Sequence, residues 1–462
     1  MFVSTDGPID VDTDVDTDVD TPRRDDSAVV TRQPYAREPQ SVDEVGIDFE
    51  RLADLALKTF LVAGRLSVGD LGDHMALPAF IAQDILDHLR RVKLLDSVAG
   101  LDPHERVQRY ALTEAGSEKA YALLQRNRYT GPTPVPLATY CDVIRRTARQ
   151  SAHVGFATLQ HAFSHLVLAP DLITQVGPAI ESGRSLFLYG SAGNGKTTIA
   201  EAIGNGCGGE TLVPYAIEAQ GEIIRVFDAA VHTVVREEDG TETDDLLAML
   251  FPQRAHRLDR RWARIRRPLL VAGGELTLDQ LELSYSPSTG VHQAPYQLKA
   301  NGGTFLLDDF GRQRVRPDDL LNRWIVPLEK GYDYLHLASG DVIEIPFEAF
   351  VIFSTNLKPR DLVDEAFLRR IQYTIEMADP TPEQYREIFR RCCVGKGFPY
   401  DAAVVDHVID RYYRSTGRPM RSCHPRDIVK RICDLASFEE RPPTLTKEAV
   451  DWACEGYFRL QE

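Results

Sequence analysis

The sequence predicts an α/β core built on a parallel sheet, with a helical region after it and a small α+β domain before it. Between about residue 137 and residue 378, helical patterns alternate with short apolar runs, as in sheets covered by helices. From about residue 380 onward the pattern is mostly helical. Before residue 131, the apolar spacing predicts three short helices, a strand pair and a fourth helix.

The composition is that of a globular protein with an acidic excess. The chain has 462 residues, of which 43% are hydrophobic and 26% charged, enough for two or three domains with buried cores. The net charge of −16 argues against general binding of nucleic acid or anionic membranes, because phosphate binding needs clustered Lys and Arg. Much of this charge lies in the first 26 residues, so the rest is less acidic.

The cysteines, the lengths of the apolar runs and the N-terminus indicate the cellular compartment of the protein. The seven cysteines are scattered and form no CxxC pair, which is typical of reduced thiols in a cytoplasmic protein. No apolar run approaches the ~18 residues that a spanning helix needs. The N-terminus lacks the basic and apolar regions of a secretory signal. We therefore expect a cytoplasmic protein without a membrane segment.

Residues 1–45 contain a low-complexity acidic repeat, with Asp at every second position from Asp12 to Asp18. These charges repel one another, and the repeat has no large side chain to bury. The sequence therefore predicts a disordered acidic tail; a docking role for it is the alternative.

Residues 46–130 read as a separate small domain. Apolar residues at helical spacing begin at Phe49, and a second helix starts near Ser67. After a third helix, the strand-like runs 94–98 and 107–112 precede another helix. This order resembles a winged helix.

The third helix of this domain is poorly suited to reading DNA. Helices that contact base edges usually present Arg, Lys, Asn or Gln near their N-terminal end, whereas this helix offers Gln83 together with the acidic Asp84 and Asp87. Its basic residues come only at its C-terminal end, where they also suit the helix dipole. Protein contact is therefore favoured over DNA binding.

The Pro-rich stretch 131–136 predicts a stiff, extended linker. It divides the small domain from the α/β core, expected over 137–378. The helical region is expected over 379–462.

A phosphate-binding motif follows the short apolar run 185–189. Glycines allow a close backbone wrap, and the N-terminus of the following helix adds positive partial charge. Lys196 would neutralise the β- and γ-phosphates, and the Thr197 hydroxyl would bind Mg²⁺. The motif matches G-x-x-x-x-G-K-[ST], the Walker A pattern. Its residues are Gly190, Ser191, Ala192, Gly193, Asn194, Gly195, Lys196, Thr197 and Thr198.

Two further apolar runs end in polar residues. The run at 304–307 ends in Asp308 and Asp309, a Walker B pattern in which Asp308 would hold Mg²⁺ and Asp309 would polarise the attacking water. The run at 350–353 ends in Ser-Thr-Asn, and Asn356 could reach the γ-phosphate or the water.

With these motifs in order, residues 137–456 resemble a complete module of the AAA+ ATPase superfamily, with Asn356 at the sensor-1 position. The resemblance implies ATP and Mg²⁺ as ligands, ATP hydrolysis, and a homo-oligomeric ring, six subunits being the family habit. Segment 364–371 resembles the part that delivers an arginine finger to a neighbouring subunit, with Arg369 narrowly favoured over Arg370. Arg426 is the candidate sensor-2 residue.

One position departs from that family. AAA+ proteins usually carry Glu where this chain has Asp309. Aspartate is shorter by one methylene, so the resemblance implies slow hydrolysis, or hydrolysis that depends on a partner.

Within the superfamily, the chain resembles the branch of bacterial enhancer-binding proteins and MoxR-type ATPases. Segments 299–304, 320–331 and 337–346 carry this likeness. The G-A-F-T-G-A loop of sigma-factor activators is absent from the matching stretch 284–290, so we expect no such activator. The stretch, which includes Tyr285, is either a pore or partner-contact loop or an ordinary surface insertion.

A basic run occupies residues 253–267. At helical spacing it could line a pore or touch nucleic acid, but such a run is more often a solvated face. Its basic residues are Arg254, Arg257, Arg260, Arg261, Arg264, Arg266 and Arg267.

The sequence thus favours an ATP-driven motor that remodels a protein partner. The alternatives are a DNA-associated AAA+ protein, such as a loader, a transposition helper or a regulator, and an ATP-binding switch with little hydrolysis.

Overall fold

The computed structural model describes residues 35–98, 107–149, 154–169, 171–206, 208–235, 257–362 and 368–459. The acidic repeat lies outside these residues. Residues 35–45, which we expected in the tail, belong to the fold: Ala36 is buried, Arg37 forms a bridge with Leu258, and Val42–Val45 form α1.

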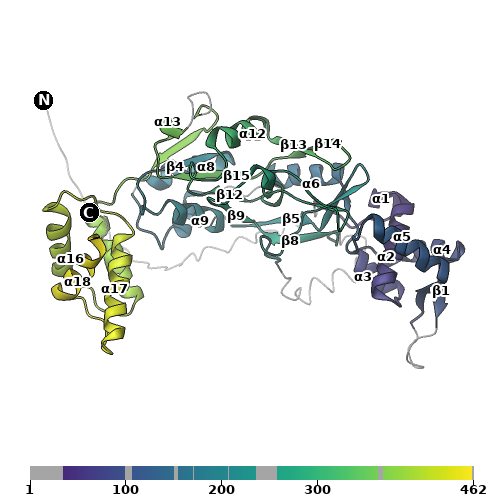
Figure 1. The fold of residues 1–462 in the computed structure, drawn as a ribbon, viewed down its shortest axis with the longest axis horizontal. Helices are drawn as coiled ribbons and strands as arrows, with labels where there is room; N and C mark the ends of the chain where they lie inside the picture. Colours follow the sequence, from purple (N-terminus) through teal and green to yellow (C-terminus); the bar gives the residue numbers. More distant parts are fainter. Residues whose placement is uncertain are drawn as a thin grey trace, which may run out of the picture.

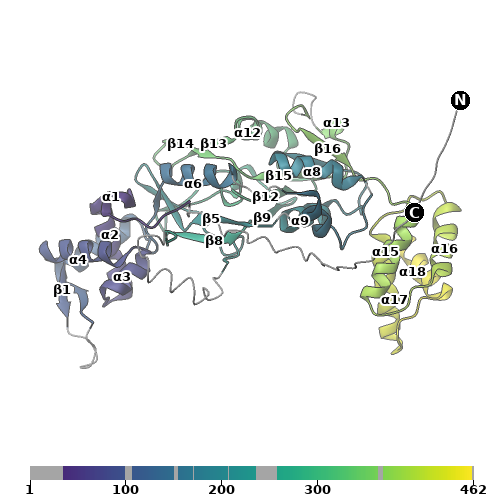
Figure 2. The ribbon, with the colours of Figure 1, turned by 180° about the vertical axis from the view of Figure 1, so that it is seen from behind.

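Three parts follow one another along the long axis of the molecule (Figure 1). The N-terminal helical domain lies at one end, the C-terminal helices at the other, and the sheets between them; the view from behind shows the same order (Figure 2). The core is therefore flanked on both sides by helical units.

The N-terminal domain has the element order that the sequence predicts. A capping box between Ser67 and Asp70 starts α3, the helix expected near Ser67, and Thr113 caps the last helix, α5. Leu66 bridges Tyr110, so the hairpin is tied to the helices. After α1 the elements are α2 (Phe49–Ala63), α3 (Val68–Met75), α4 (Ala79–Arg91), β1 (Leu95–Val98), β2 (Arg109–Leu112) and α5 (Glu114–Arg126).

The central sheet is five-stranded and wholly parallel, as expected for the α/β core. Its three central strands are short and almost fully buried, as parallel strands covered on both faces must be, whereas the two edge strands are partly exposed. In spatial order they are β16 (Tyr373–Glu376), β4 (Leu186–Tyr189), β15 (Phe350–Thr355), β12 (Thr304–Leu307) and β9 (Leu269–Ala272).

Alternating side chains of these strands enter two different hydrophobic cores. Leu186, Leu188 and Ile352 pack with α7 (Phe156–Ala162), α8 (Leu172–Ser182) and α9 (Lys196–Gly206). Phe187 and Phe353 pack on the other face with Trp324 of α12 (Pro317–Lys330). The core is thus a three-layer α/β arrangement.

A second five-stranded sheet is mixed and joins distant segments. Helix α6 (Leu137–Arg149) packs on it through Tyr140, Val143 and Ile144. In order, its strands are β10 (Ser284–Ser286), β11 (Val291–Gln293), β7 (Glu222–Arg225), β6 (Ala216–Ala219) and β3 (Val135–Pro136). Two antiparallel pairs lie beside it: β5 (Glu210–Pro214) with β8 (Trp262–Arg266), and β13 (Tyr332–His336) with β14 (Val342–Pro346).

The expected linker is part of this second sheet. Val135 and Pro136 pair with Ile217 and Glu218, and the Thr133 amide donates to the Met75 carbonyl, 2.8 Å away. Proline is tolerated here because β3 is an edge strand. The N-terminal domain is consequently joined to the sheets by a fixed strand.

The described part of the basic run, residues 257–267, is not a helix, and most of its arginines make structural contacts. Arg260 donates to Asp73 and to the Gly72 carbonyl, both 2.8 Å away, in the N-terminal domain. Arg261 is buried, paired with Asp259 at 2.8 Å, and donates to the Val45 carbonyl. Residues 262–266 form β8, in which Arg264 pairs with Glu210. Arg254 lies outside the described residues.

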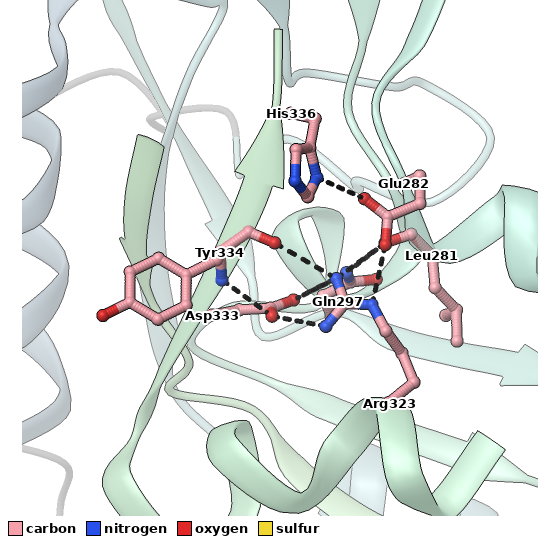
Figure 3. Close-up of polar contacts among 7 residues, drawn as sticks. All are labelled: Leu281, Glu282, Gln297, Arg323, Asp333, Tyr334 and His336. Carbon is pink, nitrogen blue, oxygen red and sulfur yellow. Dashed lines mark hydrogen bonds and ion pairs between the residues drawn. The ribbon is translucent and has the colours of Figure 1, made fainter. Parts of the chain in front are cut away.

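Arg323 of α12 is the centre of a polar cluster that holds the β13–β14 pair (Figure 3). It donates to Asp333 at 2.6 Å and to Glu282 at 2.7 Å, while Gln297 also donates to Asp333, which is buried. Helix α12, which follows strand β12, is therefore fixed to the neighbouring hairpin.

The C-terminal region is helical, as predicted. A capping box joins Thr381 and Gln384 at its start, and Tyr385, Phe389, Val405 and Ile428 lie in its own hydrophobic core. Its helices are α15 (Pro382–Gly395), α16 (Ala402–Ile409), the π-helical turn η2 (Asp410–Arg414), α17 (His424–Phe438) and α18 (Lys447–Phe458).

We expect Arg261→Met to lower the free energy of unfolding by about 3–5 kcal/mol, because Asp259 would stay buried without its cation. Urea unfolding followed by tryptophan fluorescence, to which the buried Trp262 contributes, would measure this. Arg266→Met, at an exposed position of strand β8, which follows Arg261, is the matched control. Equal midpoints for the two variants would contradict the role of the buried pair.

A second prediction concerns pH. Burial lowers the pKa of His424 from 6.5 to about 4. The unfolded chain then binds more protons between these values, so stability falls as pH drops from 6.5 toward 4, by roughly 3 kcal/mol in total. His424→Gln should lose this part of the pH dependence, which thermal unfolding at pH 7 and pH 5 would test. An unchanged difference between the two pH values would contradict it.

Candidate functional site

A cavity of about 750 Å³ lies between the carboxyl edge of the central sheet and the C-terminal helices. Residues 192–199, Asp308, Asp309 and Asn356 line it from the core. Cys392, Cys423 and other residues line it from the C-terminal region. The predicted Walker A, Walker B and sensor-1 segments therefore meet in one place.

The order of the strands in the central sheet explains why these three segments lie together. In the sheet, β15 lies between β4 and β12, so Asn356 lies between the ends of the Walker A and Walker B strands. Parallel strands end at the same edge, and crevices at such a change in strand order are where α/β sheets bind ligands.

The loop after β4 wraps tightly because three of its glycines have positive φ. Gly190, Gly193 and Gly195 have φ of 141°, 85° and 80°. A side chain at Gly190 would collide with the Met377 carbonyl. Helix α9 begins at Lys196, so its N-terminal amides face the cavity side of the loop.

Lys196 is buried, and all three partners of its ammonium group are neutral. It donates to the Gly190 carbonyl at 2.9 Å, the Ser191 carbonyl at 3.0 Å and Asn356 Oδ1 at 2.6 Å. Burial lowers its pKa, while Asp309 and Asp308 nearby oppose that shift. The cation is therefore held without direct contact to a carboxylate.

Thr197 and Asp308 form the part of the site suited to a divalent cation. The Thr197 hydroxyl lies 3.0 Å from each carboxylate oxygen of Asp308. Hydroxyl and carboxylate oxygens are ligands that Mg²⁺ accepts, usually with several waters retained. The donor set fits a Mg²⁺ ion.

Asp309 is held in an uncommon backbone conformation. Its φ is 50°, a region in which Asp is one of the few non-glycine residues seen regularly. The amide of Asn356 donates to its carboxylate at 3.2 Å. The next residue is fixed to β15, since the Phe310 amide donates to the Ser354 carbonyl at 2.7 Å. The Asn356 side chain thus bridges Lys196 and Asp309.

The segment before α17 packs directly on the phosphate-binding loop. The Cys423 amide donates to the Gly193 carbonyl at 2.9 Å. The buried Asn194 side chain donates to Asp379 at 2.7 Å and accepts from the Ser422 amide. Arg421 pairs with the same Asp379. The sequence predicted Asn194 only as a loop residue; its role in holding the C-terminal region depends on the fold.

The candidate sensor-2 residue Arg426 lines the cavity from α17. Its side chain is 74% exposed and pairs with Asp427 at 3.3 Å. Arg421 lies nearer to the loop, where its charge acts on Lys196. Sequence reasoning missed Arg421, because only the packing of the C-terminal region brings it there.

Sequence reasoning also missed the less polar side of the cavity. Residues 165–168, Ile199 and Ile388 line it. Arg391 of α15 donates to the carbonyls of Ser164 at 3.0 Å and Leu166 at 3.1 Å, which fixes this segment to the C-terminal region. No local motif marks residues 165–168, so the sequence alone could not identify them.

Arg369 and Arg370, the candidate arginine fingers, do not line the cavity. Arg370 pairs with Glu329 of α12, whereas Arg369 is exposed. Residues 364–367, which carry the rest of that resemblance, lie outside the described part of the chain.

The expected pore or contact loop is the turn of the β10–β11 hairpin, and it packs on the N-terminal domain. The Arg128 amide donates to the Thr289 carbonyl at 2.7 Å, and Gly290 has φ of 67° beside the Arg126 carbonyl. The ring of Tyr285 contacts His292. These contacts favour an ordinary surface insertion over a pore or partner-contact loop.

Across the described ranges, no group of His, Cys, Asp and Glu has the arrangement of a metal cluster, and the cysteines that the structure describes are unbridged. None of the helices that the structure describes is long and apolar enough to cross a membrane.

Comparison with known proteins gives two kinds of match. A domain of unknown function, DUF8689, matches residues 381–456, within the C-terminal helical region. The curated proteins contain no match.

Among solved structures, two mutants of RuvB from Thermotoga maritima are similar to this chain. One is 14% identical, with a TM-score of 0.33, over 65% of this chain and 70% of that chain. The other is 12% identical, with a TM-score of 0.35, over 63% of this chain and 70% of that chain. The structure titled RuvB Holliday junction branch migration motor, from the same organism, is 13% identical over 67% and 72% of the two chains, with a TM-score of 0.32. Similarity at this level does not establish a shared function.

We expect Asn194→Ala to loosen the C-terminal region from the phosphate-binding loop, because it removes the contacts to Asp379 and Ser422. Cys423 should then react faster with iodoacetamide, measured by mass spectrometry. Cys433, farther along α17, is the internal standard, and Ser191→Ala is the matched loop control. Unchanged labelling of Cys423 relative to Cys433 would show that Asn194 does not hold the two parts together.

Proposed function

We propose that this chain is a Mg²⁺-dependent ATP hydrolase of the AAA+ type, acting as an oligomeric motor that remodels a protein partner. The observation that carries the proposal is the hydrogen-bonded series Lys196–Asn356–Asp309 beside the Thr197–Asp308 contact. It sits where a glycine-rich loop meets the start of a buried helix. Each group has the chemistry that phosphoryl transfer to water requires.

Phosphate binding is assigned to the loop 190–198. Its backbone amides and the start of α9 attract anions. Lys196 has three neutral hydrogen-bond partners, so a phosphate oxygen could replace one of its carbonyl partners at little electrostatic cost. Thr197 and Asp308 would hold Mg²⁺, which supplies positive charge against the β- and γ-phosphates.

Water activation is assigned to Asp309 and Asn356. The carboxylate can orient a water and accept its proton, while the amide of Asn356 fixes the carboxylate and can contact the γ-phosphate. Because one amide contacts both Lys196 and Asp309, phosphate binding at the lysine can change the position of the carboxylate.

The base of the nucleotide is assigned to the less polar side of the cavity. Residues 165–168, Ile199 and Ile388 offer the apolar walls common in ligand pockets. Arg421 and Arg426 come from the C-terminal region and are placed to sense whether nucleotide is present.

A ring of identical subunits would supply the remaining charge. Arg369, exposed outside the cavity, is proposed as the finger that reaches a neighbouring subunit's phosphate. Arg370, which pairs with Glu329, is the alternative candidate.

A protein partner is favoured over nucleic acid on charge. The net charge is −16, and the described part of the basic run makes mostly internal contacts, through Arg260, Arg261 and Arg264. A nucleotide-binding switch with little hydrolysis is the second candidate, favoured by the short Asp309 side chain and its contact with Asn356.

The test is steady-state ATP hydrolysis over a range of protein concentrations. We expect turnover per subunit to rise with concentration, and Lys196→Ala and Asp309→Asn to lower it at least ~100-fold, as loss of a charged catalytic group does. Arg312→Ala, an exposed arginine after the Walker B segment, is the control. If Asp309 limits the rate, Asp309→Glu should raise it.

The outcomes separate the candidates. ATP binding without turnover, even with Asp309→Glu, would favour the switch. Turnover stimulated by DNA and by no protein would favour the DNA-associated alternative. Unchanged turnover in Lys196→Ala would refute the assignment of this cavity as the ATP site.

A further inference from the structure

A second cavity, remote from the first in the fold, lies where the N-terminal domain meets the second sheet. Its volume is about 260 Å³, and it is lined by segment 128–132, by Tyr215, Arg225 and Phe227, and by the β10–β11 turn. We propose that this cavity binds a nucleotide unit, with the base against the aromatic side chains and the phosphate on the two arginines.

Aromatic rings form one side of the cavity. The rings of Tyr215 and Phe227 are 5.2 Å apart and tilted by 50°, and both side chains are only partly buried. Tyr129 lines the cavity too, and its hydroxyl donates to the Pro132 carbonyl at 2.6 Å, which fixes the ring. Partly exposed rings held in place are the surfaces on which nucleic-acid bases stack.

Two guanidinium groups form the charged side. Arg128 and Arg225 are both exposed, and in the part of the chain that the structure describes neither side chain has an ion-pair partner. Their backbones are fixed: the Arg128 amide donates to Thr289, and the Arg225 carbonyl accepts from the Ala294 amide at 3.0 Å. Two positioned guanidinium groups can share one phosphate through several hydrogen bonds.

No carboxylate lines this cavity among the described residues, although the chain is strongly acidic overall. The neighbouring Asp228 is occupied by Lys299, whose ammonium lies 2.8 Å away, and by the Ala230 amide. The local potential is therefore positive, which favours an anion.

Size and chemistry together point to a nucleotide. The volume is just below the ~300 Å³ at which ligand pockets begin, so the ligand is small or is one unit of a longer chain. Base stacking combined with arginine contacts to phosphate is how single-stranded nucleic acids are held. A free nucleotide has the same two chemical parts.

The position of the cavity gives binding a structural consequence. The segment 128–132 follows α5 of the N-terminal domain, whereas Arg225 ends β7 of the second sheet. A ligand that contacts both arginines would bridge these two parts. Occupancy would therefore stiffen the junction between the N-terminal domain and the ATPase core of the proposed function.

The experiment uses the full chain with Lys196→Ala, so that the first site contributes little phosphate binding. Two probes are compared at low salt: AMP by calorimetry, and a labelled oligothymidylate of about ten nucleotides by fluorescence anisotropy. The variants are Arg128→Ala, Arg225→Ala and their combination, with Arg266→Ala as an exposed arginine outside the cavity.

We expect at least one probe to bind, and the double variant to weaken it about tenfold or more while Arg266→Ala does not. Binding of AMP identifies a free nucleotide as the ligand. Binding of the oligonucleotide alone identifies a strand, and each arginine removed should lower the salt dependence by about 0.7 in log–log slope. A strand would also favour the DNA-associated alternative for the whole protein.

Two results would overturn the inference: no binding of either probe at low salt, or equal binding by the double variant and the parent. Steady-state ATP hydrolysis of Arg128→Ala/Arg225→Ala with Lys196 intact keeps the two proposals separate. Normal turnover with lost probe binding supports the second site. If Lys196→Ala loses turnover but still binds the probe, the loss is assigned to the first site and the inference of a second site stands.

Discussion

The placement of β15 between β4 and β12 is the constraint on which the candidate site depends. Parallel strands bring their carboxyl ends to one edge, so the three segments that follow these strands share a crevice. Lys196 and Asp309 are 113 residues apart in sequence, yet one amide side chain, that of Asn356, contacts both. Burial of the strands on both faces fixes this arrangement, because alternate side chains enter the core with α9 or the core with Trp324.

The α/β core and its loop were predictable because their determinants are local. Gly190, Gly193 and Gly195 are required by a backbone that turns through positive φ, and the apolar run before them can only be a buried strand or a helix too short to stand alone. The C-terminal helices were predictable from their helical pattern after about residue 380, and local caps such as Thr381 agree with it. What the sequence could not supply was the contact between regions. Asn194 and Arg421 matter through Asp379, a residue without any motif.

The contacts of the basic run, residues 253–267, could not be predicted from the sequence either. The spacing of its seven arginines allowed a pore-lining or nucleic-acid-binding helix and favoured a solvated face, but composition says nothing about which partners the fold provides. Arg261 finds the buried Asp259, and Arg260 finds the N-terminal domain, so these charges hold the molecule together. By contrast, Arg128 and Arg225 are far apart in sequence and form a positive cavity only because the expected linker is pinned as strand β3.

The hydrogen bond from the Cys423 amide to the Gly193 carbonyl joins the first residue before α17 to the middle of the phosphate-binding loop. Helix α17 packs with α15 and α18 in one hydrophobic core, so the C-terminal helices form one packed unit. A displacement of this unit would reach the loop through the hydrogen bond between Cys423 and Gly193. If the chain works as proposed, force applied by a bound partner to the far end of these helices would displace the Gly193 carbonyl and weaken the hold of the loop on nucleotide after hydrolysis.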